Sequence, residues 1–304
     1  MSEHAGSQTR RAGFVAILGA PNAGKSTLTN RLVGAKVSIV TPKVQTTRRR
    51  ITGIVMAGDA QIILVDTPGI FAPRRRLDRA MVDAAWAGAR DADLVVLLVD
   101  AQRGIDDETR AIAEGLAKSE RNAILALNKI DRVRRPELLA LADQLNKLGK
   151  FTDIFMISAE TGDGVADLRD HLARNLPEGP WLYDPEQVSD LPERFLASET
   201  TREKLFLNLH QELPYQLTVE TEAWTDNADG SVRIDQVIYV QRENHKPIVL
   251  GKGGQRIKAI GAAARAELET ALERRVHLFL HVKVREGWAE DPARLRAIGL
   301  EPGS

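Results

Sequence analysis

Glycine, lysine and hydroxyl residues follow the first apolar stretch of the chain at a spacing that suits phosphate binding. The segment GAPNAGKST contains the pattern G-x-x-x-x-G-K-[ST]. In such a loop, successive backbone N–H groups point inward around phosphates, and the following helix presents its positive end to them. Lys25 would reach the β- and γ-phosphates, and the Ser26 hydroxyl would ligate Mg²⁺. The candidate phosphate-binding residues are Gly19, Ala20, Pro21, Asn22, Ala23, Gly24, Lys25, Ser26 and Thr27.

A second polar motif, NKID, indicates which base accompanies the phosphates. The Asp131 carboxylate can accept hydrogen bonds from guanine N1–H and from the exocyclic amine, whereas adenine presents the wrong pattern. Asn128 and Lys129 are expected to brace the loops around the base. In the later motif ISAET, Ser158 and Ala159 would complete the guanine site, with the backbone N–H near Ala159 reading guanine O6. The sequence therefore predicts GTP as the nucleotide.

Two further segments are typical of a switch that senses the terminal phosphate. KVQTTRRRITG contains adjacent threonines, one of which should give Mg²⁺ a second hydroxyl; Thr47 is favoured and Thr46 is the alternative. In DTPGI, Asp66 would hold Mg²⁺ through a water, and the Gly69 N–H would contact the γ-phosphate. Such segments order with the triphosphate and relax after hydrolysis. The candidate switch residues are Thr46, Thr47, Asp66, Thr67, Pro68, Gly69 and Ile70.

Apolar runs and helix-like stretches alternate through the first half of the chain, as expected for a mostly parallel, doubly wound sheet covered on both faces. The predicted strands are 14–19, 61–66, 93–100, 122–128 and 153–158. The predicted helices are 25–33, 78–89, 106–118, 136–148 and 164–175. The nucleotide motifs follow strand ends, where ligands of such sheets bind. This half is therefore predicted to be an α/β P-loop GTPase domain.

The second half of the chain has a different order of elements. Its predicted elements are a helix at 196–212, a hairpin of strands at 215–224 and 231–240, helices at 245–250 and 254–273, and a strand at 276–284. The order α-β-β-α-α-β matches the bacterial, type II arrangement of the α+β KH fold, which binds single-stranded RNA.

A second glycine loop, GKGG, lies between the two predicted helices of this half. A lone G-x-x-G is often only a helix-capping turn, but here the element order supports a KH loop, and 244–266 contains basic residues and no acidic one. A KH loop clamps the backbone of about four nucleotides, and basic residues neutralise the phosphates. The candidate RNA-binding residues are Lys246, Gly251, Lys252, Gly253, Gly254, Arg256 and Lys258.

Other residues near these motifs allow two interpretations each. The apolar Ile248, Val249 and Ile257 would form the floor of an RNA groove or the core of the domain. The arginine clusters at 48–50 and 74–76 would contact RNA or be solvated.

Composition describes an ordinary globular chain and excludes several kinds of site. The 304 residues are 43% hydrophobic and 28% charged, with a net charge of zero, so any nucleic-acid surface must be local. There is no cysteine, which excludes disulfides, thiolate zinc sites and cysteine nucleophiles, and the six histidines show no metal-ligand spacing. The longest apolar run is far too short to span a bilayer.

Breaks in the pattern divide the chain into five predicted parts. A proline-rich stretch, LPEGPWLYDPEQVSDLPERF, separates the two halves as a linker. The predicted parts are a disordered tail at 1–12, the GTPase domain at 13–176, the linker at 177–195, the KH domain at 196–286 and a C-terminal tail at 287–304.

Taken together, these motifs resemble those of the bacterial Era family over about 13–298. The resemblance is carried by GAPNAGKS, QTTR, DTPGI, NKID, SAET, FLASETTREKLF, ELPY, GKGGQRIKAIG and VKVREGWAEDPARLRAIG. It implies a GTPase that assists maturation of the small ribosomal subunit; the protein is separately predicted to be a monomer. It also implies that the KH domain holds single-stranded RNA near the 3′ end of the small-subunit rRNA, and that the protein is cytoplasmic and can associate peripherally with the inner membrane.

The residue after DTPG sets this chain apart from many nucleotide hydrolases, which carry a water-orienting glutamine there. Ile70 has no such group, and the resemblance implies a GTPase group in which an apolar residue replaces the glutamine. Hydrolysis would then rest on positioning and electrostatics. The related loops PNxGKS suggest that Asn22 ligates K⁺, which would supply positive charge; the alternative is that Asn22 only shapes the loop.

The residues argue against three rival functions. A non-enzymatic RNA scaffold would explain Ile70, but the set Lys25, Ser26, Thr47 and Asp66 argues against it. A tRNA-modifying GTPase of the same superfamily would carry a C-terminal cysteine motif. A tandem GTPase would carry two P-loops, whereas this chain has one.

Overall fold

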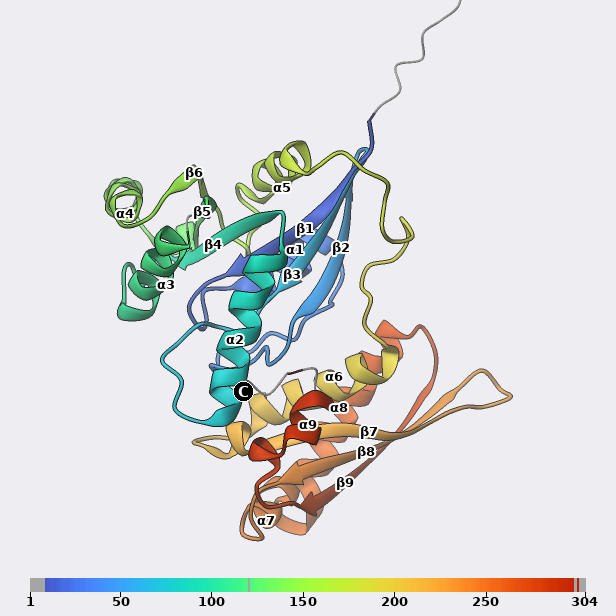
Figure 1. Cartoon of the computed structure of the whole chain (residues 1–304). Helices are drawn as coiled ribbons and strands as arrows, with labels where there is room; N and C mark the ends of the chain where they lie inside the picture. Colours follow the sequence, from blue (N-terminus) through green and yellow to red (C-terminus); the bar gives the residue numbers. More distant parts are fainter. Residues whose placement is uncertain (1–8, 120, 298–299, 301–304) are drawn as a thin grey trace, which may run out of the picture. The chain divides into compact units, whose positions relative to one another are not determined.

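We describe residues 9–119, 121–297 and 300 of a computed structural model. The chain forms two compact units (Figure 1). The first comprises Met1–Ser38, Thr47–Asp190 and Gly299–Ser304, and the second comprises Ile39–Thr46 and Leu191–Ile298. A short stretch of the first half therefore clusters with the second unit, which the sequence did not indicate.

A six-stranded sheet with the order β2-β3-β1-β4-β5-β6 forms the centre of the first unit (Figure 1). All neighbouring strands are parallel except β2 and β3. The strands are β1 (Arg11–Leu18), β2 (Ile51–Ala57), β3 (Ala60–Asp66), β4 (Leu94–Asp100), β5 (Ala123–Asn128) and β6 (Phe151–Met156). The helices are α1 (Lys25–Val33), α2 (Arg76–Asp91), α3 (Asp107–Lys118), α4 (Arg135–Leu148) and α5 (Val165–Asn175).

Helices cover both faces of this sheet, which explains its continuously apolar strands. Along β4, Val96 and Leu98 pack in a cluster with residues of α1 and α5. Val95, Leu97 and Val99 point to the opposite face and pack with residues of α2, α3 and α4. The prediction of a doubly wound, mostly parallel α/β sheet is confirmed. A short 3-10 helix, η1 (Ile130–Arg132), follows β5.

The sequence prediction missed β2, the antiparallel edge strand. It pairs with β3 from Ile51 opposite Asp66 to Ala57 opposite Ala60, so the two strands form a hairpin. Gly58 at the turn has a φ of 60°, which favours glycine. The available signal was the β-branched run ITGIV before a Gly-Asp turn; its first residues had been assigned to the candidate switch segment KVQTTRRRITG.

Residues 177–190 of the expected linker lie with the first unit. The side chain of Gln61, fully buried on β3, accepts hydrogen bonds from the backbone N–H groups of Leu182 and Tyr183. Val188 O accepts from Ile54 N at 2.9 Å, on the edge strand β2. The stretch therefore packs along the β2–β3 hairpin and is not a free linker.

A three-stranded sheet with the order β7-β8-β9 and helices α6, α7 and α8 form the second unit (Figure 1). The strands β7 and β8 are antiparallel, and β8 and β9 are parallel. The elements are α6 (Glu193–Asn208), η2 (Leu213–Gln216), β7 (Leu217–Asp226), β8 (Val232–Val240), α7 (His245–Leu250), η3 (Lys252–Gly254), α8 (Gln255–Ala271) and β9 (Val276–Val284). The predicted α-β-β-α-α-β order of a type II KH fold is confirmed.

The two ends of the chain differ from the predicted tails. Strand β1 begins at Arg11, within the stretch 1–12 that was expected to be disordered; residues 1–8 lie outside the described residues. After β9 come η4 (Trp288–Glu290) and α9 (Pro292–Ala297). Trp288 is buried, and its Nε1 donates to Gln216 O at 3.2 Å. The first part of the expected C-terminal tail is therefore packed.

Candidate nucleotide and nucleic-acid sites

The first glycine loop connects the end of β1 to the start of α1, which is the placement a phosphate-binding loop requires. Lys25 is buried, and its Nζ donates to Gly19 O and Ala20 O, each at 3.0 Å. Burial lowers the pKa of Lys25 to about 8, while the charge of Asp66 opposes the shift. The ammonium group is thus held at the loop by carbonyls that a phosphate could replace as its partner.

Gly24 lies against the NKID motif. Its φ is 99°, and a Cβ at this position would lie 2.3 Å from Asn128 Nδ2. Asn128 in turn donates to Ala23 O at 2.8 Å and accepts from Ala159 N at 2.9 Å. The Asn128 side chain therefore joins the phosphate loop to the loop after β6, as the sequence analysis expected.

Lys129 joins the same two motifs from the next position. It has a φ of 66°, and its Nζ donates to Asn22 O at 2.9 Å and pairs with Asp100 Oδ2 at 2.5 Å. A non-glycine residue in this conformation is uncommon and often marks a functional site. Asp100 was missed by the sequence analysis, although it ends strand β4 as Asp66 ends β3.

Asp131 and Ser158 lie together on the loops that should read the base. The Ser158 hydroxyl, by hydrogen bonding, is the main cause that lowers the pKa of Asp131. Ser158 is buried, and its Oγ also accepts from Thr161 N at 3.1 Å. The carboxylate is therefore kept ionised, which the predicted recognition of two guanine N–H groups requires.

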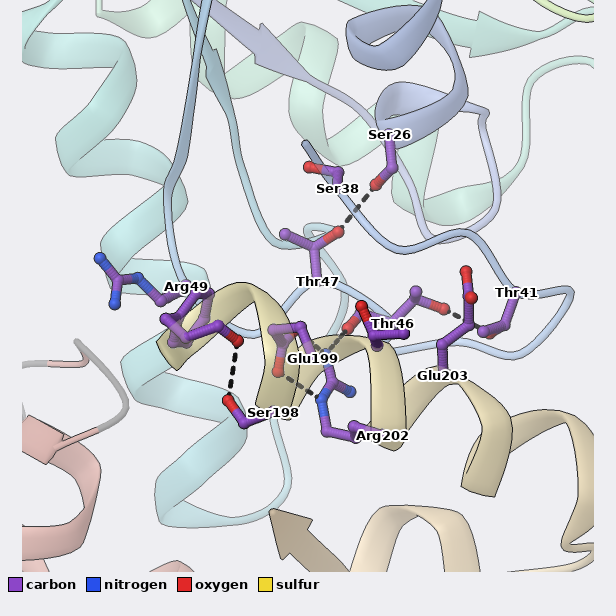
Figure 2. Close-up of polar contacts among 12 residues, drawn as sticks. Ser26, Ser38, Thr41, Thr46, Thr47, Arg49, Ser198, Glu199, Arg202 and Glu203 are labelled. Carbon is purple, nitrogen blue, oxygen red and sulfur yellow. Dashed lines mark hydrogen bonds and ion pairs between the residues drawn. The ribbon is translucent and has the colours of Figure 1, made fainter. Parts of the chain in front are cut away.

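Three hydroxyl residues and Asp66 converge beside Lys25. Ser26 Oγ and Thr47 Oγ1 are 2.8 Å apart (Figure 2). Ser38 donates to Asp66 Oδ2 at 2.8 Å, and Thr47 Oγ1 lies 3.5 Å from the same atom. Burial raises the pKa of Asp66, against the charge of Lys25 and these hydroxyls.

This oxygen cluster fits Mg²⁺. Adjacent ligands of an octahedral Mg²⁺ ion lie about 2.9 Å apart, which matches the spacing of Ser26 and Thr47. The Oδ1 atom of Asp66 is buried and has no hydrogen-bond partner among the residues that the structure describes. Hard oxygen donors with one unsatisfied carboxylate oxygen are what Mg²⁺ and its bound waters use.

The two adjacent threonines have different neighbours. Thr46 Oγ1 lies 2.6 Å from Thr41 Oγ1 and donates to Lys43 O at 2.7 Å, so it is engaged within its own segment. Thr47 is the one that contacts Ser26 and Asp66. The geometry therefore favours Thr47, and not Thr46, as a magnesium ligand.

The rest of DTPGI is fixed to the phosphate loop and the core. Thr67 Oγ1 donates to Ile17 O at 2.7 Å, and Ile70 N donates to Gly19 O at 3.2 Å. The Ile70 side chain is 6% exposed and packs with Leu18 and Ala20. Ile70 therefore serves as a core residue that anchors the candidate switch segment DTPGI, and its side chain is packed in the core.

The glycine loop of the second unit is open where the first is enclosed. Gly251, Gly253 and Gly254 have positive φ angles of 72°, 57° and 75°. Lys252 and Gly253 are exposed at the tip, and Arg256 and Lys258 are exposed on the first turn of α8, whereas Lys246 is half-buried on α7. The structure thus brings Lys252, Arg256 and Lys258 to the loop and the helix start that follows it, whereas Lys246 lies at the far end of the short helix α7.

The apolar residues near this loop divide between surface and core. Ile248 is 47% exposed, Val249 is fully buried, and Ile257 is partly buried against the core. Arg256 Nη1 donates to Ile248 O at 2.5 Å, linking α8 to α7. Ile248 and Arg256 also line a cleft of about 410 Å³. Only Val249 is therefore purely a core residue.

The two arginine clusters of the first unit also divide. Arg48 is buried, and Arg50 donates to Ala84 O at 2.9 Å and pairs with Asp91 at 3.2 Å, so Arg50 braces α2. Arg74 and Arg75, before α2, are exposed. The cluster at 48–50 is thus largely structural.

Known proteins similar to this chain share both units. The family model for a 50S ribosome-binding GTPase matches residues 14–129, and that for a KH domain matches residues 212–289. "GTPase Era" of Rhizobium meliloti is 61% identical over 297 residues, covering 98% of this chain and 95% of the relative. "GTPase Era" of Dinoroseobacter shibae is 61% identical over 294 residues, covering 96% of both.

The chain belongs to the Era family of GTPases. Two solved Era structures have the same two-unit fold, each with a TM-score of 0.91, 38% identity, and coverage of 96% of this chain and 99% of the other. One is a point variant of Aquifex aeolicus Era bound to GDP·AlF4⁻. The other is Era in complex with MgGDPNP and nucleotides 1506–1542 of 16S ribosomal RNA.

Two further kinds of feature are absent from the described part of this Era-family chain. Among the described residues, no cluster of three or more histidine and carboxylate side chains could hold a metal ion. None of the helices within 9–119 and 121–297 has the length and apolar character needed to span a bilayer.

Proposed function

We propose that this Era-family protein is a Mg²⁺-dependent, GTP-hydrolysing switch that binds single-stranded RNA near the 3′ end of the small-subunit rRNA and assists small-subunit maturation. The observation that carries the nucleotide half is the convergence of Ser26, Thr47 and Asp66 beside Lys25. The observation that carries the RNA half is the open, basic GKGG loop in a KH fold. Both ligands are present in the similar Era complex with MgGDPNP and 16S rRNA.

The nucleotide site divides its work among these residues. Ser26 and Thr47 would ligate Mg²⁺ directly, and Asp66 would hold it through water; the ion neutralises charge on the transferring phosphoryl group. Lys25 would bind the phosphates, and the Gly69 N–H would contact the γ-phosphate. Asn128 and Lys129 would hold the loops, while Asp131, Ser158 and Ala159 read the guanine.

Hydrolysis without a glutamine requires another source of transition-state stabilisation. Asn22 has a φ of 64° at the middle of the phosphate loop, and its carbonyl is held by Lys129. This fixed turn supports a K⁺ ion ligated by the Asn22 side chain, which would add positive charge near the phosphates. Hydrolysis should then be about tenfold or more faster in potassium than in sodium buffer; equal rates would exclude the ion.

The Asp131→Asn variant tests the guanine pocket directly. An amide presents a donor where the carboxylate only accepts, so the variant should lose GTP affinity by about 100-fold or more and gain affinity for xanthosine triphosphate. Competition of both nucleotides against a fluorescent GDP measures the preference. A variant that still prefers GTP would place the pocket elsewhere.

Crosslinking tests the RNA half of the function. The full-length protein with a GTP analogue bound would be crosslinked to total cellular RNA, and the attached RNA sequenced. Enrichment of the small-subunit rRNA 3′ end is expected, and a diffuse profile would contradict this target. Cell fractionation tests the prediction that the protein is cytoplasmic and can associate peripherally with the inner membrane, and size-exclusion chromatography tests the prediction that it is a monomer.

A further inference from the structure

The segment Ile39–Thr46 begins and ends at the nucleotide site but clusters with the second unit. Ser38, immediately before it, donates to Asp66 Oδ2, and Thr47, immediately after it, lies beside Ser26. Both flanking residues are thus anchored at the candidate magnesium site. The stretch between them is an element of the RNA-binding unit.

Two neighbouring residues of α6, Arg202 and Glu203 (labelled in Figure 2), bond to the two ends of this segment. Arg202 Nη2 donates a hydrogen bond to Thr46 O. Glu203 Oε1 accepts one from Val40 N at 2.9 Å. Both side chains are buried, at 1% and 3% exposure, so these bonds are shielded from water. Hydrogen bonds to ionised groups are about twice as strong as neutral ones.

Arg202 is itself held in a fixed orientation. Its Nε donates to Glu199 Oε1 at 2.7 Å, one turn earlier on α6, and the two side chains form an ion pair. The guanidinium lies 5.1 Å from the centre of the Phe206 ring. A buried charge with these partners has little freedom to follow the segment if the segment moves.

Hydrogen bonds within the segment Ile39–Thr46 also connect its residues to one another. Thr46 Oγ1 contacts Thr41 Oγ1 and Lys43 O, and Lys43 N donates to Thr41 Oγ1 at 3.2 Å. These bonds turn the stretch between Val40 and Thr46 into one connected loop. A shift at Thr46 therefore displaces Thr47, which is the next residue along the chain.

We infer that Arg202 and Glu203 are positioning residues for the GTP-bound state, holding Ile39–Thr46 so that Thr47 stays beside Ser26 and Asp66. The inference rests on the proposed function, because it requires that Thr47 serve Mg²⁺ and the triphosphate. GDP lacks the γ-phosphate that orders such a segment. Arg202 and Glu203 therefore favour triphosphate over diphosphate, and the bound triphosphate reciprocally stabilises the hold on α6.

Nucleotide affinities of the full-length protein separate this role from simple packing. Arg202→Ala and Glu203→Ala remove the two bonds, whereas Arg202→Lys keeps a donor and Glu203→Gln keeps an acceptor. Thr201→Val is the matched control, because Thr201 is equally buried on α6 but its hydroxyl donates to Gln236 on β8. For each variant, the Kd of GDP and of GDPNP is measured with Mg²⁺ by fluorescence titration.

Arg202→Ala should weaken GDPNP about tenfold, the loss of roughly one charge-assisted hydrogen bond. GDP binding should change less than about twofold, because GDP leaves the segment unordered. Glu203→Ala should act in the same direction, the lysine and glutamine variants should recover part of the loss, and Thr201→Val should lower thermal stability without changing the GDPNP-to-GDP ratio.

Thr47→Ala separates failure of this inference from failure of the proposed function. If Thr47→Ala weakens GDPNP selectively and Arg202→Ala does not, the positioning role is wrong and the magnesium site stands. If Thr47→Ala leaves the ratio of the GDPNP and GDP Kd values unchanged, the positioning role and the magnesium site at Thr47 are both overturned. An equal loss of both nucleotides in Arg202→Ala would show that the residue acts only through stability.

Discussion

Both units of this protein carry a glycine loop that leads into the start of a helix, but the two loops are built differently. The first is enclosed: Gly24 lies so close to Asn128 that any Cβ would collide with it, and Lys25 is buried. The second is open: a Cβ at Gly253 or Gly254 would meet no described atom within 4 Å.

The difference matches two modes of phosphate recognition. An enclosed loop holds the phosphates of one nucleotide in a fixed position, as hydrolysis requires, because small displacements of reacting groups lower the reaction rate. An open, basic loop lets a polymer backbone approach and binds it largely through charge, so its affinity depends on salt. Rigidity in one unit and access in the other are thus consistent with a nucleotide hydrolase joined to an RNA-binding domain.

The largest expected effect comes from closing the space at the first loop. Gly24→Ala adds a Cβ 2.3 Å from Asn128 Nδ2 at a φ of 99°, so nucleotide affinity should fall by about 1,000-fold. Gly58→Ala is the control, because its φ is 60° and no described atom lies within 4 Å of its Cβ. Fluorescent GDP titration compares them; equal affinities would show that the first loop is not enclosed.

A charge reversal at the second loop should have the next largest effect. The double variant Lys252→Asp, Gly253→Asp should bind single-stranded rRNA about 100-fold less tightly and show a shallower salt dependence, with GTP affinity unchanged. Lys118→Asp with Gly58→Asp makes the same charge change on exposed positions of the first unit. Filter binding over a range of salt concentrations measures both; similar RNA affinities in the two variants would place the RNA site elsewhere.

Within the second loop, the first glycine should be less replaceable than the third residue. A Cβ at Gly251 would lie 2.6 Å from Arg256 Cβ, so Gly251→Ala should cost about 2–3 kcal/mol of the second unit's stability. Gly253→Ala meets open space and should cost about 1 kcal/mol, the strain of its positive φ alone. Hydrogen exchange of the α8 amides measures both costs, and equal values would contradict the difference.

The smallest effect is expected at Ser158. Its hydroxyl lowers the pKa of Asp131, so Ser158→Ala should raise that pKa toward the ordinary value of about 3.9. The carboxylate is ionised at pH 7 in both proteins, so GDP affinity at that pH should change less than about threefold, and the two should diverge only as the pH falls through these pKa values. Carboxyl NMR of Asp131 follows the titration; an unmoved midpoint would exclude the Ser158 contact.

Sequence reasoning succeeded where residue type and strand ends determine position. The P-loop, NKID and ISAET each follow a parallel strand, and the carboxyl ends of such strands meet at one edge, so Asn128 could be expected to reach Ala23 and Ala159. The type II KH order was likewise predicted, because a turn, TDNADG, separates its first two strands and GKGG separates its last two helices.

Assignment failed where the local pattern is weak or absent. Strand β2 has a β-branched run as its local signal, but the run begins inside the candidate switch segment, and its pairing with β3 establishes the strand. Sequence could not show that Ile39–Thr46 clusters with α6, because that depends on Arg202 and Glu203, far along the chain. Asp100 was missed for a similar reason, since its partner Lys129 lies on the next strand's loop.

The stretch at 177–190 has a further consequence for the first unit. Strand β2 is one of the two outer strands of the sheet, and unpaired outer strands are templates for pairing with other chains. Here Val188 O accepts from Ile54 N, and Ser189 Oγ donates to Thr52 O at 2.7 Å. Residues 177–190 thus cover the β2 edge of the sheet. A fragment that ends at residue 176 would expose the backbone groups of this edge strand and would be prone to self-association.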